Sequence, residues 1–589
     1  VGSDGFFKND LTGKKVDGIQ TVGGRLRGIY KANDRLTMDL SLNYDYCDEG
    51  AYPYYYAESL TEKEQYADYV GKISNNTESR YRRNMLNTGL NISYDLGDVE
   101  IRSVTSFQNL CDRMFQDQDF LPRDIYTMEQ RQRINTLTEE VTARSKHGAI
   151  WNWVGGLNVT KQWLRTEGPV TFGKDGVAML EQNINSVLPE NPPMSINFRG
   201  ENLRMGGIFE TPMLNLGVFH QSVFNITKAL SLTAGIRLDY EKNSINYDTS
   251  SSVDYGFSMP SMHVDFQDLT ANITEYDGKI NRDRFNVLPK VALKYDFDAN
   301  NNVYMSVARG MRSGGYNIQM FSDLLQGAMQ KKMMDGVKEA TFAYLDKNMP
   351  MIADKIKMMI SAVMPKVELS GVETVAYSPE FSWNYEVGSH LTLADRTLML
   401  DGALFYNRVN DMQVVRFAPS GLGRMMVNAG ESESYGCELT LLWTPIRSLA
   451  ISGNYGYNQV TFVDYNTASG QDSKKGADYS GNYVPFVPKH TMNVDAAYTF
   501  EIGDNALTIG ANVSGAGRIY WTESNDVSQP FYALLGARMS YKTPAFTVTL
   551  WGKNLLDKEY NTFYFESASR GFEQHAKPLR VGVDFSFGF

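Results

Sequence analysis

Two groups of aromatic and cationic side chains are the main candidates for binding chemistry. The stretch AYPYYYAESL at 51–60 carries Tyr54 and Tyr56, and Arg82 lies in the cationic run RYRR at 80–83. Aromatic rings can stack on a flat ligand, and guanidinium groups donate paired hydrogen bonds to anions. The first group therefore predicts contact with a flat, anionic ligand. The alternative is that the tyrosines pack within the loop or form an interfacial belt.

The second group is the stretch RGMRSGGYN at 309–317. Arg312 lies beside a pair of glycines near the outer end of a predicted strand, and Tyr316 and Asn317 follow. We predict that Arg312 faces the interior opening of the molecule and that Tyr316 and Asn317 join it in a ligand site.

Neither catalysis nor metal binding is predicted. The six histidines show no paired ligand spacing, and the three cysteines (Cys47, Cys111 and Cys437) match no zinc or CxxC pattern. No GxSxG, HExxH or P-loop motif is present. We therefore expect no catalytic residue, no metal ligand and no cofactor, although nothing in the pattern tests for a carboxylate pair. A net charge of −11 argues against a nucleic-acid partner.

The elements that must position these residues are long strands with two unlike faces. In LTMDLSLNY at 36–44, apolar and polar residues alternate strictly, and the pattern recurs at 230–240, 492–502 and 507–515. Each run has about ten residues, which is what a tilted strand needs to cross a bilayer. No run approaches the ~18–20 apolar residues of a membrane-spanning helix. The pattern predicts a membrane β-barrel with one face toward lipid, in preference to a sandwich or propeller.

The connections between strands alternate in length. Short turns are predicted at 31–35, 96–98, 225–230, 298–302, 393–397, 444–448, 503–505 and 542–545. Long segments are predicted at 48–82, 111–131, 165–212, 248–283, 316–380, 464–488 and 564–576. Short periplasmic turns and long extracellular loops are typical of outer-membrane barrels. About nineteen strands fit between Ile19 and Phe589, and because the number should be even, an odd number of strands is expected upstream.

Four stretches resemble TonB-dependent outer-membrane receptors along essentially the whole chain, 1–589. They are VYMSVARGMRSGGYN at 303–317, YSPEFSWNYEVGSHLTL at 377–393, VTLWGKNLLDKEY at 548–560 and the terminal Phe589. The resemblance implies an all-β fold, a 22-stranded antiparallel transmembrane barrel, with three strands, the plug domain and the TonB box absent from this chain. The start VGSDGFFKND lacks Met and a signal peptide, so we expect a processed or partial product.

The chain ends on an alternating strand, RVGVDFSFGF at 580–589. Phe585, Phe587 and Phe589 form a membrane-facing stripe. The resemblance implies that this stripe is also the signal that the barrel-assembly machinery reads, and that the strand closes the cylinder against the first one.

One long outer loop contains two segments with helical periodicity. FSDLLQGAMQKKMMDGVKEATFAYL at 321–345 and MPMIADKIKMMISAVMP at 349–365 predict a helical hairpin over 321–365. Its apolar stripes could pack on each other, form a lid over the lumen, or dock a surface lipoprotein. Methionine-rich faces are adaptable, which favours a contact surface.

The resemblance implies active transport of a scarce nutrient across the bacterial outer membrane, driven by the TonB–ExbB–ExbD complex through the plug. An iron–siderophore is the default ligand, and cobalamin, haem, an oligosaccharide or a peptide are alternatives. For haem, the family's Phe-Arg-Ala-Pro box is missing, which leaves His263 as the only axial candidate. A docking barrel of an outer-membrane assembly, or an open pore, are the rival functions. Outer-membrane lipid, including lipopolysaccharide, is a further expected contact.

Overall fold

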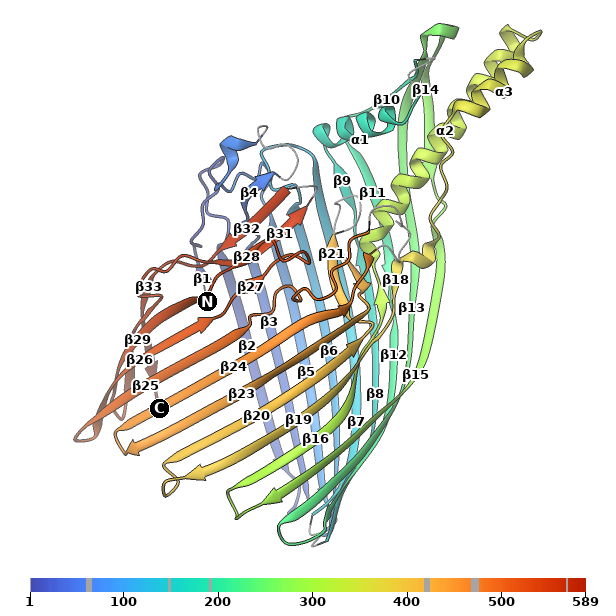
Figure 1. Cartoon of the computed structure of the whole chain (residues 1–589). Coiled ribbons are helices and arrows are strands. Elements are labelled where there is room, and N and C mark those ends of the chain that lie inside the picture. The colour runs from blue at the N-terminus through green and yellow to red at the C-terminus, as the bar shows by residue number, and fades with distance from the viewer. Residues whose placement is uncertain are drawn as a thin grey trace.

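The computed structural model describes residues 2–59, 66–146, 150–189, 193–417, 424–467, 476–567 and 570–588. Within them, one curled antiparallel sheet dominates the molecule (Figure 1). Nineteen long strands follow one another along the chain, and each pairs with the next. They are β2 (Ile19–Lys31), β3 (Leu36–Gly50), β5 (Arg80–Asp95), β6 (Val99–Asp117), β7 (Tyr126–Ser145), β8 (Trp151–Glu167), β12 (Met213–Asn225), β13 (Leu230–Met259), β15 (Asp277–Asp296), β16 (Asn302–Arg312), β19 (Glu380–Leu393), β20 (Leu398–Asn410), β23 (Glu431–Ile446), β24 (Leu449–Asp464), β25 (His490–Ile502), β26 (Asn505–Ala516), β29 (Tyr532–Lys542), β30 (Phe546–Lys553) and β33 (Arg580–Phe587).

The other elements lie beside this sheet or in the loops. Short strands that join the main sheet are β1 (Gly2–Ser3), β9 (Val170–Phe172), β10 (Ser195–Arg199), β11 (Leu203–Glu210) and β14 (Val264–Ile273). Loop strands are β4 (Tyr55–Ser59), β17 (Gly315–Tyr316), β18 (Ala376–Tyr377), β21 (Gln413–Phe417), β22 (Arg424–Asn428), β27 (Ile519–Tyr520), β28 (Ser528–Gln529), β31 (Asn561–Ser567) and β32 (Arg570–His575). The helices are α1 (Lys174–Ser186), α2 (Phe321–Asn348) and α3 (Ala353–Val363), with short 3-10 turns η1 (Ala67–Tyr69), η2 (Pro260–Met262), η3 (Ile318–Met320) and η4 (Val372–Val375).

The two ends of the sheet differ as the connection lengths predict. All eight predicted short turns lie at one end, and the long loops lie at the other, which we call the mouth (Figure 1). Two predicted loop boundaries are wrong. The connection at 111–131 shrinks to 118–125, because β6 and β7 continue past the membrane-spanning part, and most of 248–283 is strand, because β13 continues into a hairpin with β14.

Alternation along each strand separates an apolar outer face from a polar inner face. On β8, Trp151, Leu157 and Trp163 share the outer face, and all three are exposed. The two tryptophans lie about 30 Å apart along the barrel axis for a tilted strand, so they mark aromatic girdles at both interfaces. Leu157 lies midway between them, where the bilayer is most apolar.

Glu139 is an exception on the outer face. It pairs in the ladders with Thr105 and Val159, near the middle of the apolar band. Ser103 Oγ and Thr105 Oγ1 donate hydrogen bonds to its two carboxylate oxygens at 2.6 and 2.5 Å. These neighbouring hydroxyls supply the polar contacts that lipid cannot offer.

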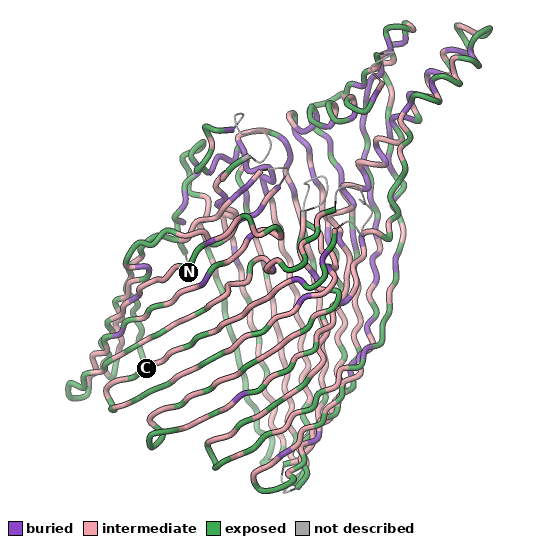
Figure 2. Tube along the Cα trace, viewed as in Figure 1, coloured by how far each residue is buried: buried purple, intermediate pink, exposed green. Residues whose placement is uncertain are grey.

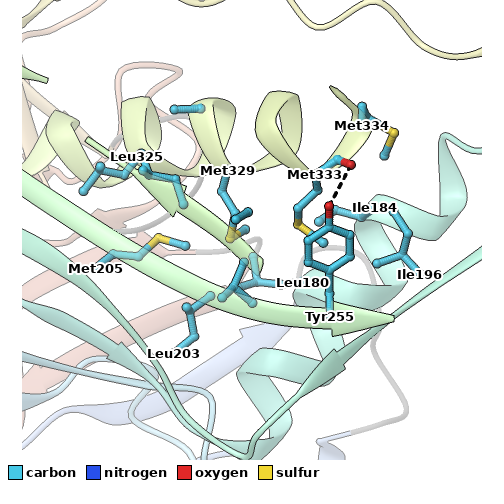
Figure 3. Packing of buried hydrophobic residues seen from close by; sticks show 14 of the residues in the cluster. Leu180, Ile184, Ile196, Leu203, Met205, Tyr255, Leu325, Met329, Met333 and Met334 are labelled. Atoms are coloured by element: carbon cyan, nitrogen blue, oxygen red, sulfur yellow. Dashed lines mark hydrogen bonds between the residues drawn. The ribbon is translucent and has the colours of Figure 1, made fainter. Parts of the chain in front are cut away.

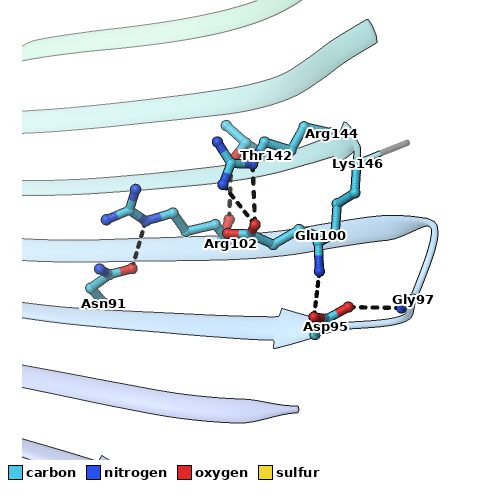
Figure 4. Close-up of polar contacts among 8 residues, drawn as sticks. All are labelled: Asn91, Asp95, Gly97, Glu100, Arg102, Thr142, Arg144 and Lys146. Carbon is cyan, nitrogen blue, oxygen red and sulfur yellow. Dashed lines mark hydrogen bonds and ion pairs between the residues drawn. The ribbon is translucent and has the colours of Figure 1, made fainter. Parts of the chain in front are cut away.

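The inner face carries polar networks, and one of them lies beside a short turn (Figure 4). Arg144 donates to Glu100 at 2.7 Å, and Arg102 donates to Asn91 at 2.8 Å. Lys146 pairs with Asp95 at 2.5 Å beside the tight turn at Gly97. A polar, hydrated interior is what the alternation predicts.

A separate hydrophobic core lies beyond the membrane-spanning part of the barrel, in an arm that rises from the mouth. Buried residues concentrate there and in the loops, whereas barrel strands are mostly intermediate or exposed (Figure 2). Helix α2 packs its apolar stripe on β13, β14 and β11, and α1 joins the same core (Figure 3). Tyr255 Oη donates to Met333 O at 3.1 Å. The predicted helical insertion is present.

The expectation that the two helices bury their stripes on each other holds only in part. Lys357 of α3 reaches Asp346 and the ring of Phe342 in α2, which makes the pair a hairpin. However, most of the apolar stripe of α2 packs against β13 and β14. The side chains of Met351, Met358 and Met359 remain 98%, 73% and 62% exposed. Docking of a surface lipoprotein by this face stays a prediction.

The outermost long strands are β2 and β33. Among the described residues, no ladder joins these two strands directly, and β2 is flanked on its other edge by Gly2 and Ser3 alone. At the mouth, β4 from one side pairs with β32 from the other, so a small sheet with β31 links the two edges. Closure by three further strands stays a prediction. Among the described helices, none is both long and apolar enough to cross a membrane.

Candidate ligand-binding site at the mouth of the barrel

Two loop segments cross the mouth. One is the run 313–320 after β16, and the other is the hairpin β21–β22; together we call them the mouth cover. Gln319 Nε2 lies 3.7 Å from the sulfur of Met128 on β7, although four strands of the sheet separate β7 from β16. Arg424 on β22 reaches the rings of Phe563 and Phe565 in the loop before β33. These contacts carry the two segments across the upper end of the lumen.

Asn317 fastens the two parts of the mouth cover together. Its side-chain Nδ2 donates to Met426 O at 2.8 Å, and its Oδ1 accepts from Met426 N at 2.7 Å. The side chain is only 9% exposed. The pair of bonds copies the pattern of a β-bridge, so Asn317 orders the cover and does not present its amide to a ligand.

The serine and glycines of the SGG element are held by neighbouring polar groups. Ser313 Oγ donates to Glu241, and Gln413 Nε2 donates to Ser313 O and Ser378 O at 2.9 and 3.0 Å. A Cβ on Gly314 would lie 2.6 Å from Tyr377 O, so only glycine fits this approach. The element is an anchor for the mouth cover.

An aromatic core adjoins the mouth cover, where Arg424 contacts the ring of Phe565. It joins three loops through Tyr54, Tyr56, Tyr66, Phe120, Leu121, Phe565 and Phe572. Ring centroids of Tyr54 lie 4.8 Å from Phe565 and 5.1 Å from Phe120, in edge-to-face contact. Such pairs add about 0.5–1.5 kcal/mol each beyond area burial, so the core holds these loops in place.

An exposed aromatic and cationic surface adjoins this core. Phe486 stacks on Phe563 with centroids 5.6 Å apart, and the Arg424 guanidinium lies 5.3 Å from the Phe563 ring. Phe486 is 46% exposed and has a φ of 66°, which is strained for a bulky residue. We call Phe486, Phe563 and Arg424 the mouth platform. It can stack on a flat ligand and donate to an anion.

The candidates predicted from the sequence fall in different places. Tyr54 and Tyr56 are 8% and 1% exposed, so they form the aromatic core. Arg312 lies on the inner face of β16, and Tyr316 Oη donates to Asn243 O at 3.2 Å. Arg82 does not face the mouth as predicted. The ladders place it on the outer face of β5, in line with Leu86 and Leu90, and it forms an ion pair with Asp48 at 3.2 Å.

The motifs singled out in the sequence do not predict the mouth platform. Phe563 belongs to the aromatic stretch NTFYFES at 561–567, which resembles the tyrosine-rich loop in composition and could have drawn attention. Phe486 and Arg424 lie in loops without any such signal. Their role follows only from their contact.

Burial sets the protonation of several loop groups around the mouth. It raises the pKa of Tyr52, whose hydroxyl donates to the sulfur of Met114, to about 12. Burial raises the pKa of Tyr54 as well, against the opposing effect of Arg424. Burial also raises the pKa of Asp119, whose carboxylate accepts hydrogen bonds from the backbone amides of Leu121, Ile125 and Tyr126. Burial raises the pKa of Glu523 as well.

A cavity that is separate from the mouth platform lies at the edge of the sheet. It measures about 500 Å³ between the N-terminal segment and the loop before β5, and among the described residues that line it Tyr52 is the only aromatic one. It therefore offers little stacking surface, and the mouth platform is the better candidate. No group of three or more metal-ligating side chains occurs in the described part of the chain.

The terminal aromatic stripe lies on the outer face of the last strand. Phe585 and Phe587 are 54% and 64% exposed, and Phe585 stacks on Phe546 of β30 at 5.7 Å. Phe589 lies outside the described residues. The role of the stripe in barrel insertion stays a prediction.

A family model described as "TonB dependent receptor-like, beta-barrel" matches residues 13–555. The chain belongs to this family. The pesticin receptor of Yersinia pestis is 24% identical over 379 residues, which is 64% of this chain and 44% of that protein. The chain thus matches less than half the length of this curated relative.

Solved structures confirm the transmembrane barrel fold of this TonB-dependent receptor chain. The ferric yersiniabactin uptake receptor FyuA from Yersinia pestis aligns with a TM-score of 0.68 at 18% identity, covering 99% of this chain and 73% of that one. The siderophore receptor PiuA from Acinetobacter baumannii aligns with 0.64 at 15% identity, covering 98% and 75%. The predicted outer-membrane location is confirmed with the family.

Removing the Asn317 side chain is expected to release the mouth cover of this TonB-dependent barrel. Asn317→Ala deprives the half-buried N–H and C=O of Met426 of their side-chain partners, at a cost of about 1–3 kcal/mol. We expect the Met426 amide to exchange its hydrogen at least tenfold faster. Asn300→Ala, in an exposed turn at the opposite end, serves as the control, and an unchanged Met426 amide would contradict the fastening role.

Proposed function

We propose that the chain forms the barrel of a receptor that takes up a ferric siderophore across the outer membrane, driven by the TonB–ExbB–ExbD complex. The observation that carries this proposal is the mouth platform, where Arg424 lies over Phe563 beside the exposed Phe486. Ferric siderophores are bulky, and many carry aromatic rings and negative charge. The platform offers a stacking surface and a cation for such a ligand.

The relatives support the same ligand class. FyuA is named as a ferric yersiniabactin uptake receptor, PiuA as a siderophore receptor, and an Escherichia coli relative, 26% identical over 191 residues, as a ferrichrome transporter. Their low identity carries no residue assignment to this chain.

Transport through this barrel requires the mouth cover to move. Ligand first contacts the mouth platform, and the cover must then lose its cross-mouth contacts at Arg424 and Gln319. Asn317 keeps the two parts of the cover together, so we propose that they move as one unit. We propose that a plug domain, which the resemblance to the family implies, transmits the pull of TonB.

A fluorescence titration tests the ligand class. Trp521 lies 5.6 Å from Phe486, so a ligand on the mouth platform should quench it. The full receptor is titrated with ferric yersiniabactin, ferrichrome, haem, cyanocobalamin and a maltooligosaccharide. We expect saturable quenching by a ferric siderophore, with most of the change lost in Trp521→Phe. Saturable quenching by haem, cyanocobalamin or the oligosaccharide, with none by a ferric siderophore, would contradict the proposal and identify the ligand class instead.

A further inference from the structure

The outer wall carries a group of arginines at the mouth end of four neighbouring strands. Their alternation places them on the same outward face as the apolar band below, as Leu86 on β5 and Leu137 on β7 illustrate. The group, which we call the arginine belt, consists of Arg80 and Arg82 on β5, Arg113 on β6, Arg131 and Arg133 on β7, and Arg165 on β8.

The strand register makes several of these arginines cross-strand neighbours. Arg82 pairs with Arg113, and Arg113 pairs with Arg131, so three guanidinium groups start from directly opposite positions on adjacent strands. In the next row toward the membrane, Arg133 pairs with Arg165. Like charges at directly opposite positions destabilise a sheet. An anion between them would reverse that repulsion.

The carboxylates on this face do not neutralise the belt. Asp48 is shared by Arg80 and Arg82 at 2.6 and 3.2 Å, and Glu129 by Arg113 and Arg131 at 2.6 and 2.9 Å. Arg165 pairs with Glu167 at 3.2 Å and faces Glu210 across the ladder.

Two observations show that the arginine belt can bind a further anion. Arg133 is exposed, and in the described part of the chain no carboxylate lies within ion-pair distance of it. The paired arginines keep roughly half of their side-chain surface exposed, between 42% and 54%. Six arginines thus face four carboxylates.

The belt lies at the level of lipid headgroups. Trp163, on the outer face, is two residues from Arg165 toward the membrane and is 47% exposed. Lys161, next on the same face, directs its ammonium group toward the Trp163 ring at 5.8 Å. A lysine that reaches up to an interfacial tryptophan marks the edge of the hydrocarbon. The guanidinium groups therefore start just above it.

We propose that the arginine belt binds the phosphates of lipopolysaccharide in the outer leaflet, with its acyl chains against the apolar wall below. Guanidinium groups bind phosphate through paired hydrogen bonds. Strands lie ~4.8 Å apart, so four strands spread the charges over about 15 Å, which suits a glycolipid with phosphates at both ends of a disaccharide. The corresponding outward positions on β26 and β29, Gly515 and Ala533, carry no charge.

Native mass spectrometry of the full receptor tests the site with four probes: bisphosphorylated lipid A, monophosphorylated lipid A, phosphatidylglycerol and inorganic phosphate. We expect bisphosphorylated lipid A to bind best. The variant R113Q/R131Q/R133Q should bind it at least tenfold more weakly. Arg133→Gln alone should weaken it about threefold without disturbing folding, because Arg133 lacks an ion-pair partner among the described residues.

The control is R102Q/R144Q, which removes charge from the inner face near the short turns. It should bind lipid A as the wild type does. Equal loss in the control, no loss in either belt variant, or equal binding of phosphatidylglycerol or inorganic phosphate would overturn the proposal. Binding of ferric siderophore by the belt variants should be unchanged, which separates this site from the mouth platform.

Discussion

Arg424→Ala is expected to weaken binding of a ferric siderophore by about 10- to 100-fold. The guanidinium lies 5.3 and 5.4 Å from the rings of Phe563 and Phe565, so its charge is fixed at the mouth platform. A hydrogen bond to a charged group contributes about 1.5–3 kcal/mol, and 1.4 kcal/mol is a tenfold change in affinity. Equilibrium titration monitored at Trp521 measures the effect.

Two further variants make this result specific. Arg424→Lys keeps the charge but loses the planar fork, so we expect an intermediate affinity. Arg447→Ala removes an exposed arginine at the opposite end of the barrel and should leave affinity unchanged. Wild-type affinity in Arg424→Ala would mean that the ligand does not use the mouth platform.

Leu157→Arg is expected to destabilise the barrel by about 2–4 kcal/mol. Leu157 is 55% exposed on the outer face, midway between Trp151 and Trp163, and its ladder partners are Val141 and Val218. An arginine at the midplane of the lipid face carries this cost. Urea unfolding of the full receptor in lipid vesicles, followed by heat-modified mobility in gels, measures it.

The matched control is the adjacent residue. Asn158 lies on the inner face and pairs in the ladders with Glu140 and Gly217. Asn158→Arg places the same charge in the wet lumen beside a carboxylate, so we expect a change below about 0.5 kcal/mol. Equal destabilisation by the two variants would show that the register or the lipid-facing side of β8 is assigned incorrectly.

Much of the barrel is determined by local pattern. A period of two fixes which residues of a strand share a face, so LTMDLSLNY at 36–44 already assigns Leu40 and Leu42 to lipid. The turn signals assign the short connections to one end. The helical period of 321–345 and 349–365 predicts α2 and α3 for the same reason. Each of these features depends on residues close together in the sequence.

The loop boundaries were less accurate, for a physical reason. Strand β13 continues as a hairpin with β14 because α2 and α1 cover it, and this cover comes from two other loops. The residues at 248–259 therefore gain a buried face from partners that the local sequence does not contain. The apolar stripe of α2 packs against this β13–β14 hairpin. The methionines of α3 therefore remain exposed.

Local patterns in the sequence predict the two faces of the strands and the helical insertion, and the quoted motifs predict the family. Which distant residues meet follows only from the folded structure. Arg424 and Phe563 belong to loops of different hairpins, and Arg82, Arg113 and Arg131 become neighbours only through the register of three strands. Contacts across a barrel mouth or between strands depend on closure and register, which alternation within one strand does not encode.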